Sequence, residues 1–293
     1  MHRRDILTLT AAGAAAAALP APSSAKGAAP RSKTPDLFVR DWGEGRPVVF
    51  LAGWTLTSDT WGYVMQPLAR QGLRTIAYDR RGHGGSADPG RGYDFDTLAD
   101  DLKAVLERLD LKDVVLVAHS MGGGEAIRYF ARHGGTRLSH LVLVAPATPC
   151  IMQKADNPMG VPAAALDQNR AVMARDFPAW MDANGGGFFT PDTSEGVKTW
   201  VKTQMQRTSL QALVECNRAL CEADFRPELS KVSVPTLVLH GDKDASAPLD
   251  FTGRRTAAGI KGAKLVVYEG APHGLFVSHA ARLAADIAAF AKT

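Results

Sequence analysis

The chain has few cysteines and no extended run of one charge. Its 293 residues include 3 cysteines, so at least one is unpaired within a monomer. Their spacing fits no metal site, and buried free thiols are the favoured state for Cys150, Cys216 and Cys221, although a bridge from Cys150 to either of the others stays open. Lysine and arginine number 34 against 30 acidic residues and are scattered. The resulting charge of +4 gives little reason to expect a nucleic-acid partner.

The sequence also lacks an apolar run of the roughly 20 residues that a membrane span requires. The apolar segment 6–19 is shorter and alanine-rich, follows Arg3 and Arg4, and precedes a proline-rich stretch. This order predicts a signal peptide over residues 1–25, with paired arginines that resemble a twin-arginine export signal. An ordinary Sec signal or an uncleaved anchor is the alternative. We expect an exported protein, in a bacterial periplasm or outside the cell, with no stable membrane span after signal removal.

The rest of the chain has the pattern of an α/β protein. Hydrophobic residues make up 45% of the sequence and charged residues 22%, enough for one large domain or two small ones. Short apolar runs alternate with helical patterns from residue 36 onward, which predicts a mostly parallel sheet with helices on both faces. The expected strands are 37–41, 48–52, 75–78, 114–118, 141–145, 236–240 and 265–268, and the expected helices include 96–109, 121–133 and 275–289.

The rhythm changes between residues 146 and 226. This stretch has scattered prolines, a glycine break at 185–187, helical patterns at 197–206 and 210–219, and no convincing buried strand. We therefore expect a core formed by residues 32–150 and 226–293, with residues 151–225 inserted as a helical cap over the carboxyl ends of the strands. Such a cap would exclude water and shape a substrate pocket.

A serine stands at the junction between an expected strand and an expected helix. The segment 118–124 reads Ala-His-Ser-Met-Gly-Gly-Gly, which is typical of a nucleophile elbow centred on Ser120. Small residues are needed two positions before and after the serine because the turn is tight. Gly122 meets this need, whereas Ala118 stands where glycine is usual and predicts a tighter fit.

A serine hydroxyl needs a histidine base, and the histidine needs an acid that fixes its tautomer. The chain order expected after an elbow is serine, then acid, then histidine. His273 follows the last expected strand and has both the right order and a loop position. The acid is Asp244 or Asp242, and Asp244 is favoured because Asp242 sits at the turn, where it can cap backbone amides.

The same chemistry requires two hydrogen-bond donors for a developing oxyanion. One donor should be the backbone N–H of Met121, at the positive end of the helix that it begins. The second should come from the loop after the strand 48–52, where the Trp54 N–H is the best candidate. The Trp54 indole would then line the substrate pocket.

These segments together resemble the α/β-hydrolase fold, and within it the cofactor-free haloperoxidase and aryl-esterase branch. The resemblance is carried by segments 52–54, 77–84, 92–97, 118–124, 128–129, 240–244 and 272–274. It implies a serine hydrolase that acts on a small-molecule ester or lactone through an acyl-serine, without metal or other cofactor. A perhydrolase or a carbon–carbon bond hydrolase could use the same triad, and a non-catalytic binding protein is disfavoured because the triad is complete. Perhydrolase members often carry proline after the oxyanion-loop aromatic, where this chain has Thr55.

Overall fold

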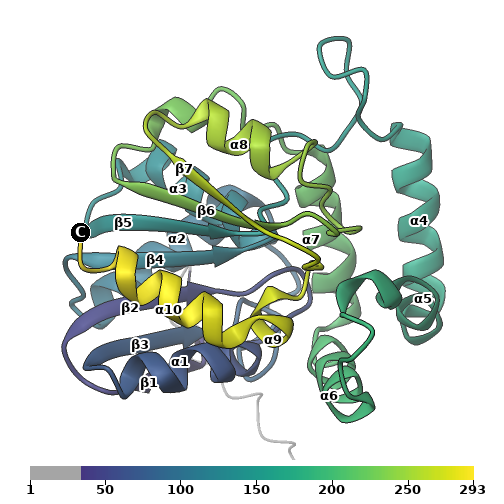
Figure 1. Ribbon diagram of the computed structural model, residues 1–293. Helices are drawn as coiled ribbons and strands as arrows, with labels where there is room; N and C mark the ends of the chain where they lie inside the picture. Colours follow the sequence, from purple (N-terminus) through teal and green to yellow (C-terminus); the bar gives the residue numbers. More distant parts are fainter. Residues whose placement is uncertain (1–33) are drawn as a thin grey trace, which may run out of the picture. The chain divides into compact units, whose positions relative to one another are not determined.

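A seven-stranded sheet forms the centre of the fold (Figure 1). The computed structural model describes residues 34–293, so the expected signal peptide lies outside the described residues. The strand order is β1-β3-β2-β4-β5-β6-β7; β1 is antiparallel to β3 and the other pairs are parallel. The strands are β1 (Val39–Trp42), β2 (Arg46–Leu51), β3 (Leu73–Tyr78), β4 (Val114–His119), β5 (Leu138–Val144), β6 (Thr236–Gly241) and β7 (Lys264–Tyr268). All seven expected strands are present with small shifts at their ends, and the expected α/β fold class is confirmed.

Two hydrophobic cores cover the two faces of the sheet. Side chains alternate between the faces along a strand, so in β2 Val49 and Leu51 join one core whereas Val48 and Phe50 join the other. The first core packs under α2 (Phe95–Arg108), α3 (Met121–His133) and α8 (Gly253–Gly259). The second packs under α1 (Gly62–Ala69), α9 (Leu275–Ser278) and α10 (Ala280–Phe290). Because both faces are covered, the central strands are continuous apolar runs.

Two helix ends differ from the sequence-based expectation. The N-cap of α2 is Asp94, whose carboxylate accepts a hydrogen bond from the Thr97 amide at 2.9 Å, so the helix begins at Phe95, one residue before the expected start. The expected helix 275–289 is split into α9 and α10 at His279, which has φ of −131°. The His279 ring packs edge-on against Tyr268, with ring centroids 5.7 Å apart. This packing accompanies the break, although no proline or glycine marks it in the sequence.

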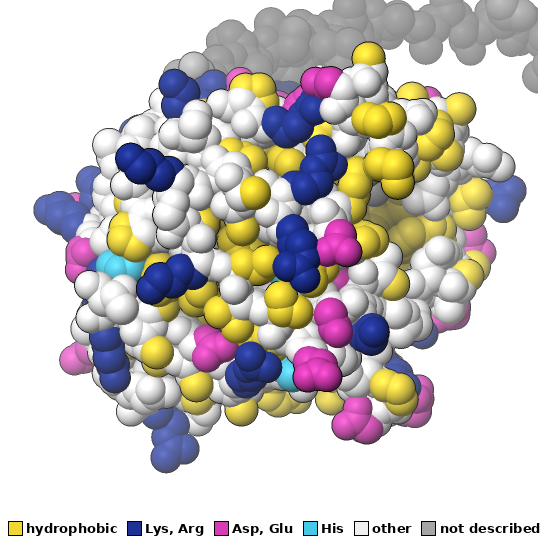
Figure 2. Space-filling view, turned by 45° about the horizontal axis from the view of Figure 1, so that its top comes forward, with side chains coloured by type: hydrophobic (Ala, Val, Ile, Leu, Met, Phe, Trp, Pro, Cys, Tyr) yellow, Lys and Arg dark blue, Asp and Glu magenta, His cyan; other side chains and the backbone are white. Residues whose placement is uncertain are grey.

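Four α-helices stand between β5 and β6, in the segment expected to form a cap. They are α4 (Ala163–Arg175), α5 (Phe177–Asn184), α6 (Glu195–Met205) and α7 (Leu210–Glu222), with the 3-10 turn Gly185–Phe188 after α5. They lie beside one end of the sheet (Figure 1). On the same side of the molecule, hydrophobic side chains surround a hollow in the surface (Figure 2).

The three cysteines are buried and free, as favoured from the sequence. Within residues 34–293, no helix has both the length and the apolar character needed to cross a membrane.

Candidate active site

Ser120 occupies the turn between β4 and α3 in a strained backbone conformation. Its φ of 52° and ψ of −116° lie outside the helical and extended regions, a departure that costs about 1–3 kcal/mol and persists only where the surroundings enforce it. The Ser120 amide donates to the Val144 carbonyl at 3.0 Å, and the Ser120 carbonyl accepts from the amides of Gly123 and Ala147. These bonds hold the serine at the carboxyl edge of the sheet.

Close packing around the turn explains why the residues two positions before and after Ser120 are small. A Cβ atom at Gly122 would lie 2.9 Å from the Leu51 Cβ atom and 3.0 Å from the Leu51 carbonyl oxygen, so this position needs glycine. Ala118 is fully buried against the core on the α2–α3 face. The fold thus accommodates alanine two residues before the serine, where glycine is usual.

His273 and Asp244 meet at the same edge of the sheet. The Nδ1 atom of His273 lies 2.7 Å from the Asp244 Oδ2 atom, and both side chains are buried. The other carboxylate oxygen of Asp244 accepts the amides of Ser246 and Ala247 at 2.9 and 2.7 Å. Asp242 is exposed and accepts the Gly270 amide at 2.7 Å. Its position is the turn-capping one, away from His273.

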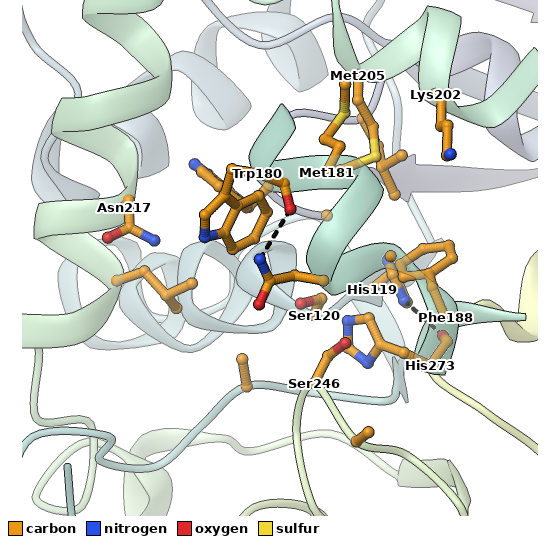
Figure 3. A pocket seen from close by; sticks show the side chains of 18 of the residues that line it. His119, Ser120, Trp180, Met181, Phe188, Lys202, Met205, Asn217, Ser246 and His273 are labelled. Carbon is orange, nitrogen blue, oxygen red and sulfur yellow. Dashed lines mark hydrogen bonds between the residues drawn. The ribbon is translucent and has the colours of Figure 1, made fainter. Parts of the chain in front are cut away.

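Several donors keep Asp244 ionised. Burial alone would raise its pKa, but the nearby His273, the hydrogen bonds from His240 and His273, and the Ala247 amide outweigh burial and hold the pKa below its ordinary value. A carboxylate at this position fixes the proton of His273 on Nδ1. The Nε2 atom is then the ring nitrogen free to accept a proton. His273 and Ser120 line the same cavity (Figure 3).

The two expected oxyanion donors have backbone amides without acceptors. Within residues 34–293, neither the Trp54 nor the Met121 N–H donates to a protein oxygen. Trp54 belongs to the loop after β2, and its indole Nε1–H donates to the Leu213 carbonyl of α7 at 2.9 Å. The next residue, Thr55, has φ of 62° and is fully buried. The Trp54 side chain therefore attaches this loop to α7.

A buried ion pair connects this loop to α3. Arg80 follows β3 and its guanidinium donates to the Glu125 carboxylate, with 2.7 Å between Nε and Oε1. The same guanidinium donates to the carbonyls of Ala52 at 2.7 Å and Gly53 at 3.3 Å. Burial disfavours the charged form of Arg80, but the Glu125 carboxylate outweighs burial and raises the Arg80 pKa. Arg80 thus joins the loop of Trp54 to α3, the two elements that carry the expected oxyanion donors.

A cavity of about 340 Å³ lies over Ser120, at the small end of the range typical of ligand pockets. Its wall includes Ser120, Trp54 and His273, together with residues between β5 and β6 that sequence reasoning did not single out. Figure 3 shows how these side chains surround the serine. The segment 151–225 contributes Ile151, Trp180, Met181, Asn184, Gly185, Phe188, Phe189, Lys202, Met205, Asn217, Leu220 and Cys221.

Two buried histidines, His119 and His83, differ in their relation to the cavity. His119 lines it, and its Nε2 atom lies 3.1 Å from the His273 carbonyl oxygen. Burial and the neighbouring His273 lower the pKa of His119 well below its usual range, so the ring is neutral and its Nε2–H supports the His273 backbone. His83, in the loop after β3, is fully buried and lies outside the cavity wall.

In the part of the chain that the structure describes, no group of three or more His, Cys, Asp or Glu side chains is placed to hold a metal ion.

Comparisons with known proteins agree with this arrangement. The alpha/beta hydrolase fold family matches residues 46–280. A non-heme chloroperoxidase of Kitasatospora aureofaciens is 43% identical over 82% of this chain and 89% of its own length. A bifunctional esterase/perhydrolase of Acinetobacter calcoaceticus is 34% identical over 88% of this chain and 96% of its own. The structure of an esterase from Exiguobacterium antarcticum superposes with a TM-score of 0.84, at 32% identity over 88% of this chain and 96% of that one. The chain is an enzyme of the alpha/beta hydrolase fold family.

Proposed function

We propose that the protein is a serine hydrolase that cleaves a small ester, lactone or related carbonyl compound through an acyl-serine intermediate, with Ser120, Asp244 and His273 as its triad. The observation that supports it is the 2.7 Å contact between His273 and Asp244 at the wall of the cavity that also contains the strained Ser120. Backbone strain that the surroundings enforce is concentrated at functional sites, and a buried carboxylate–imidazole pair is what activation of a serine needs.

The reaction follows from these positions. The Ser120 oxygen attacks the substrate carbonyl carbon while its proton moves to His273 Nε2, and the carbonyl oxygen becomes an oxyanion that accepts the Trp54 and Met121 amides. Collapse breaks the bond to the leaving oxygen, which takes the proton from His273. Water then attacks the acyl-serine and gives its proton to His273. Collapse of this second intermediate breaks the bond between the acyl carbon and the Ser120 oxygen, which takes the proton back from His273 as the acid is released.

Labelling with a fluorophosphonate tests the proposal. Folded wild-type protein should be labelled at Ser120 and should hydrolyse short-chain 4-nitrophenyl esters, whereas Ser120→Ala should do neither because the nucleophile is gone. Equal unfolding curves for the two proteins would show that the substitution leaves the fold intact. Absence of label on the wild-type serine would contradict the proposal, and so would esterase activity retained by Ser120→Ala.

Perhydrolysis is a second candidate because the relatives include a non-heme chloroperoxidase and a bifunctional esterase/perhydrolase. In that reaction hydrogen peroxide replaces water as the attacking group and the product is a peracid, which oxidises a halide. Thr55 weighs against perhydrolysis as the main activity, because perhydrolases often carry proline at this position. The φ of Thr55 is 62°, a value that proline, with φ fixed near −65°, cannot adopt. Peroxide-dependent bromination in the presence of a short carboxylic acid, compared with ester hydrolysis, would rank the two activities.

Export is a separate proposal supported by the N-terminal sequence alone. Fractionation of a bacterium that produces the full chain should place the enzyme outside the cytoplasm, and replacement of Arg3 and Arg4 by lysine should reduce export if the twin-arginine route is used. Retention of the wild-type chain in the cytoplasm would contradict this expectation.

A further inference from the structure

One polar side chain interrupts the face that α7 presents to the cavity. Asn217, Leu220 and Cys221 of this helix all line the cavity wall, as residues three and four positions apart share one helical face. Asn217 is 9% exposed and lies in the middle of the helix. Asparagine is a poor choice for a helix interior because its amide competes for backbone groups. Its presence at this buried position therefore needs another reason.

The amide of Asn217 is only half used by the protein. Its Oδ1 atom accepts a long hydrogen bond from the Cys221 thiol, at 3.7 Å. Burial raises the pKa of that thiol to about 11, so the sulfur carries the proton that it donates. The hydrogen bonds of residues 34–293 leave the Nδ2 group of Asn217 without an acceptor. The Nδ2 atom is not one of the fully enclosed side-chain atoms that lack a partner, and Asn217 lines the cavity. A donor in such a wall is normally satisfied by water or by a ligand.

The position of Asn217 relative to the triad indicates which part of a substrate would reach it. The leaving oxygen must lie next to His273, because it takes its proton from that ring. Asn217 and His273 lie on opposite sides of Ser120 (Figure 3). The acyl chain, bonded to the carbonyl carbon at Ser120, therefore extends away from His273 and toward α7. The wall around this path is otherwise apolar on α7, where Leu220 adjoins Asn217.

We propose that Asn217 selects the acyl group: the preferred substrates are esters or lactones whose apolar acyl chain carries a hydrogen-bond acceptor, such as a ketone or ether oxygen, several carbons from the reacting carbonyl. This inference rests on the proposed serine-hydrolase function and specifies its substrate class. In the free enzyme a water molecule would accept the hydrogen bond of the Nδ2 group. A substrate oxygen can replace this water without loss of the hydrogen bond. An acyl chain that is purely apolar displaces the water and leaves the donor unpaired.

A matched series of esters tests this. The probes are 4-nitrophenyl heptanoate and its analogues with a ketone at carbon 4, 5 or 6 of the acyl chain, which differ little in size. Wild-type kcat/KM should be about 5- to 30-fold higher for the best ketone than for the plain heptanoate, the cost of stranding one buried donor. The ratio is taken relative to hydrolysis of the same esters by hydroxide, which removes differences in intrinsic reactivity.

Two variants make the result specific to the amide. Asn217→Leu, close in size and without a donor, should bring the ketone preference to about 1, whatever its rate with the heptanoate. Asn217→Asp, assayed at a pH where the carboxyl group is ionised and offers only acceptor oxygens, should also lose the ketone preference, and it keeps the test decisive if the leucine variant fails to fold. Urea unfolding of all three proteins monitors folding.

The outcomes separate this inference from the proposed function. A wild-type enzyme that hydrolyses all four esters at the same corrected rate would overturn the role of Asn217 and leave the serine-hydrolase function standing. A ketone preference that persists in the folded variants would overturn it as well. Inactivity toward the whole series, together with no fluorophosphonate label on Ser120, would overturn the proposed function and with it this inference.

Discussion

Replacing Glu125 with glutamine would leave the Arg80 guanidinium buried without its counter-charge. The two side chains are 4% and 1% exposed, so water cannot solvate the remaining charge. Removal of one partner from a buried pair typically costs about 3–5 kcal/mol. Arg80 would keep its hydrogen bonds to the carbonyls of Ala52 and Gly53, and glutamine can still accept one bond. We therefore expect the lower end, a loss of about 3 kcal/mol in the free energy of unfolding.

The same substitution should slow the reaction more than it weakens substrate binding. Arg80 connects the loop of Trp54 to α3, which begins at Met121, so loosening this connection displaces the two amides from the oxyanion. Those amides act mainly in the transition state, and loss of one such donor costs about 10²-fold or more in kcat. A displaced donor should cost about 10-fold, with KM nearly unchanged.

Urea unfolding and ester hydrolysis of the same preparation measure both effects. With a slope near 3 kcal/mol per molar urea, the midpoint should fall by about 1 M. The control is Glu107→Gln on α2, because Glu107 pairs with Lys103 four residues earlier and both are well exposed. Loss of that pair should cost at most about 0.5 kcal/mol and leave kcat unchanged. The reasoning is refuted if Glu125→Gln unfolds at the same urea concentration as the control and keeps wild-type kcat.

Three further substitutions address the triad, the pH dependence of stability and the oxyanion loop. Asp244→Asn should lower kcat by about 10⁴-fold and Asp242→Asn by only a few-fold, because of the two acids only Asp244 contacts His273. The reverse order of the two kcat values in steady-state assays would show that the acid is misassigned. Burial and the nearby Arg80 lower the pKa of His83 to about 3, below the value of about 6.5 in an unfolded chain. The unfolded chain therefore binds the proton first, and stability falls with pH below about 6.5. Between pH 7.5 and 5 the His83 contribution should fall by about 2 kcal/mol, so the stability difference between wild type and His83→Gln, measured by urea unfolding, should change by that amount; parallel pH profiles would contradict it. Thr55→Pro should lower esterase kcat/KM at least about 10-fold, because residue 55 must leave its φ of 62° when proline fixes φ near −65°. Unchanged hydrolysis would show that this turn does not hold the Trp54 amide in place.

The sheet and the elbow could be predicted from the sequence because each depends on local patterns. Buried parallel strands are continuous apolar runs, and a serine between such a run and a helical pattern marks the turn. The order of Asp244 and His273 also placed both at carboxyl ends of later strands, where parallel strands meet at one edge. The break at His279 could not be predicted, since it accompanies packing against Tyr268 and not a proline or glycine.

The ion pair of Arg80 and Glu125 shows a second limit of sequence reasoning. The two residues are 45 positions apart, and each alone is an ordinary charged residue in a loop or helix. Only the fold reveals that both are buried and that the guanidinium also binds two carbonyls of the loop after β2. Charge in the core is costly unless it is paired and hydrogen-bonded, so a motif with two adjacent arginines after a strand could have raised the question of a partner without identifying it.

The residues that line the cavity are harder to predict than the triad, because a helix face that packs on the core and one that faces an apolar cavity have the same hydrophobic periodicity. Residues that face the core and residues that face an apolar cavity are both hydrophobic, so periodicity in the cap does not separate them. Asn217 is the exception, since it interrupts a buried face that includes Leu213 and Leu220. A polar residue in such a face either has a protein partner or faces a space, and its unpaired Nδ2 group favours the second case. Departures from the apolar pattern in cap helices are therefore the positions at which substrate specificity should first be sought in this chain.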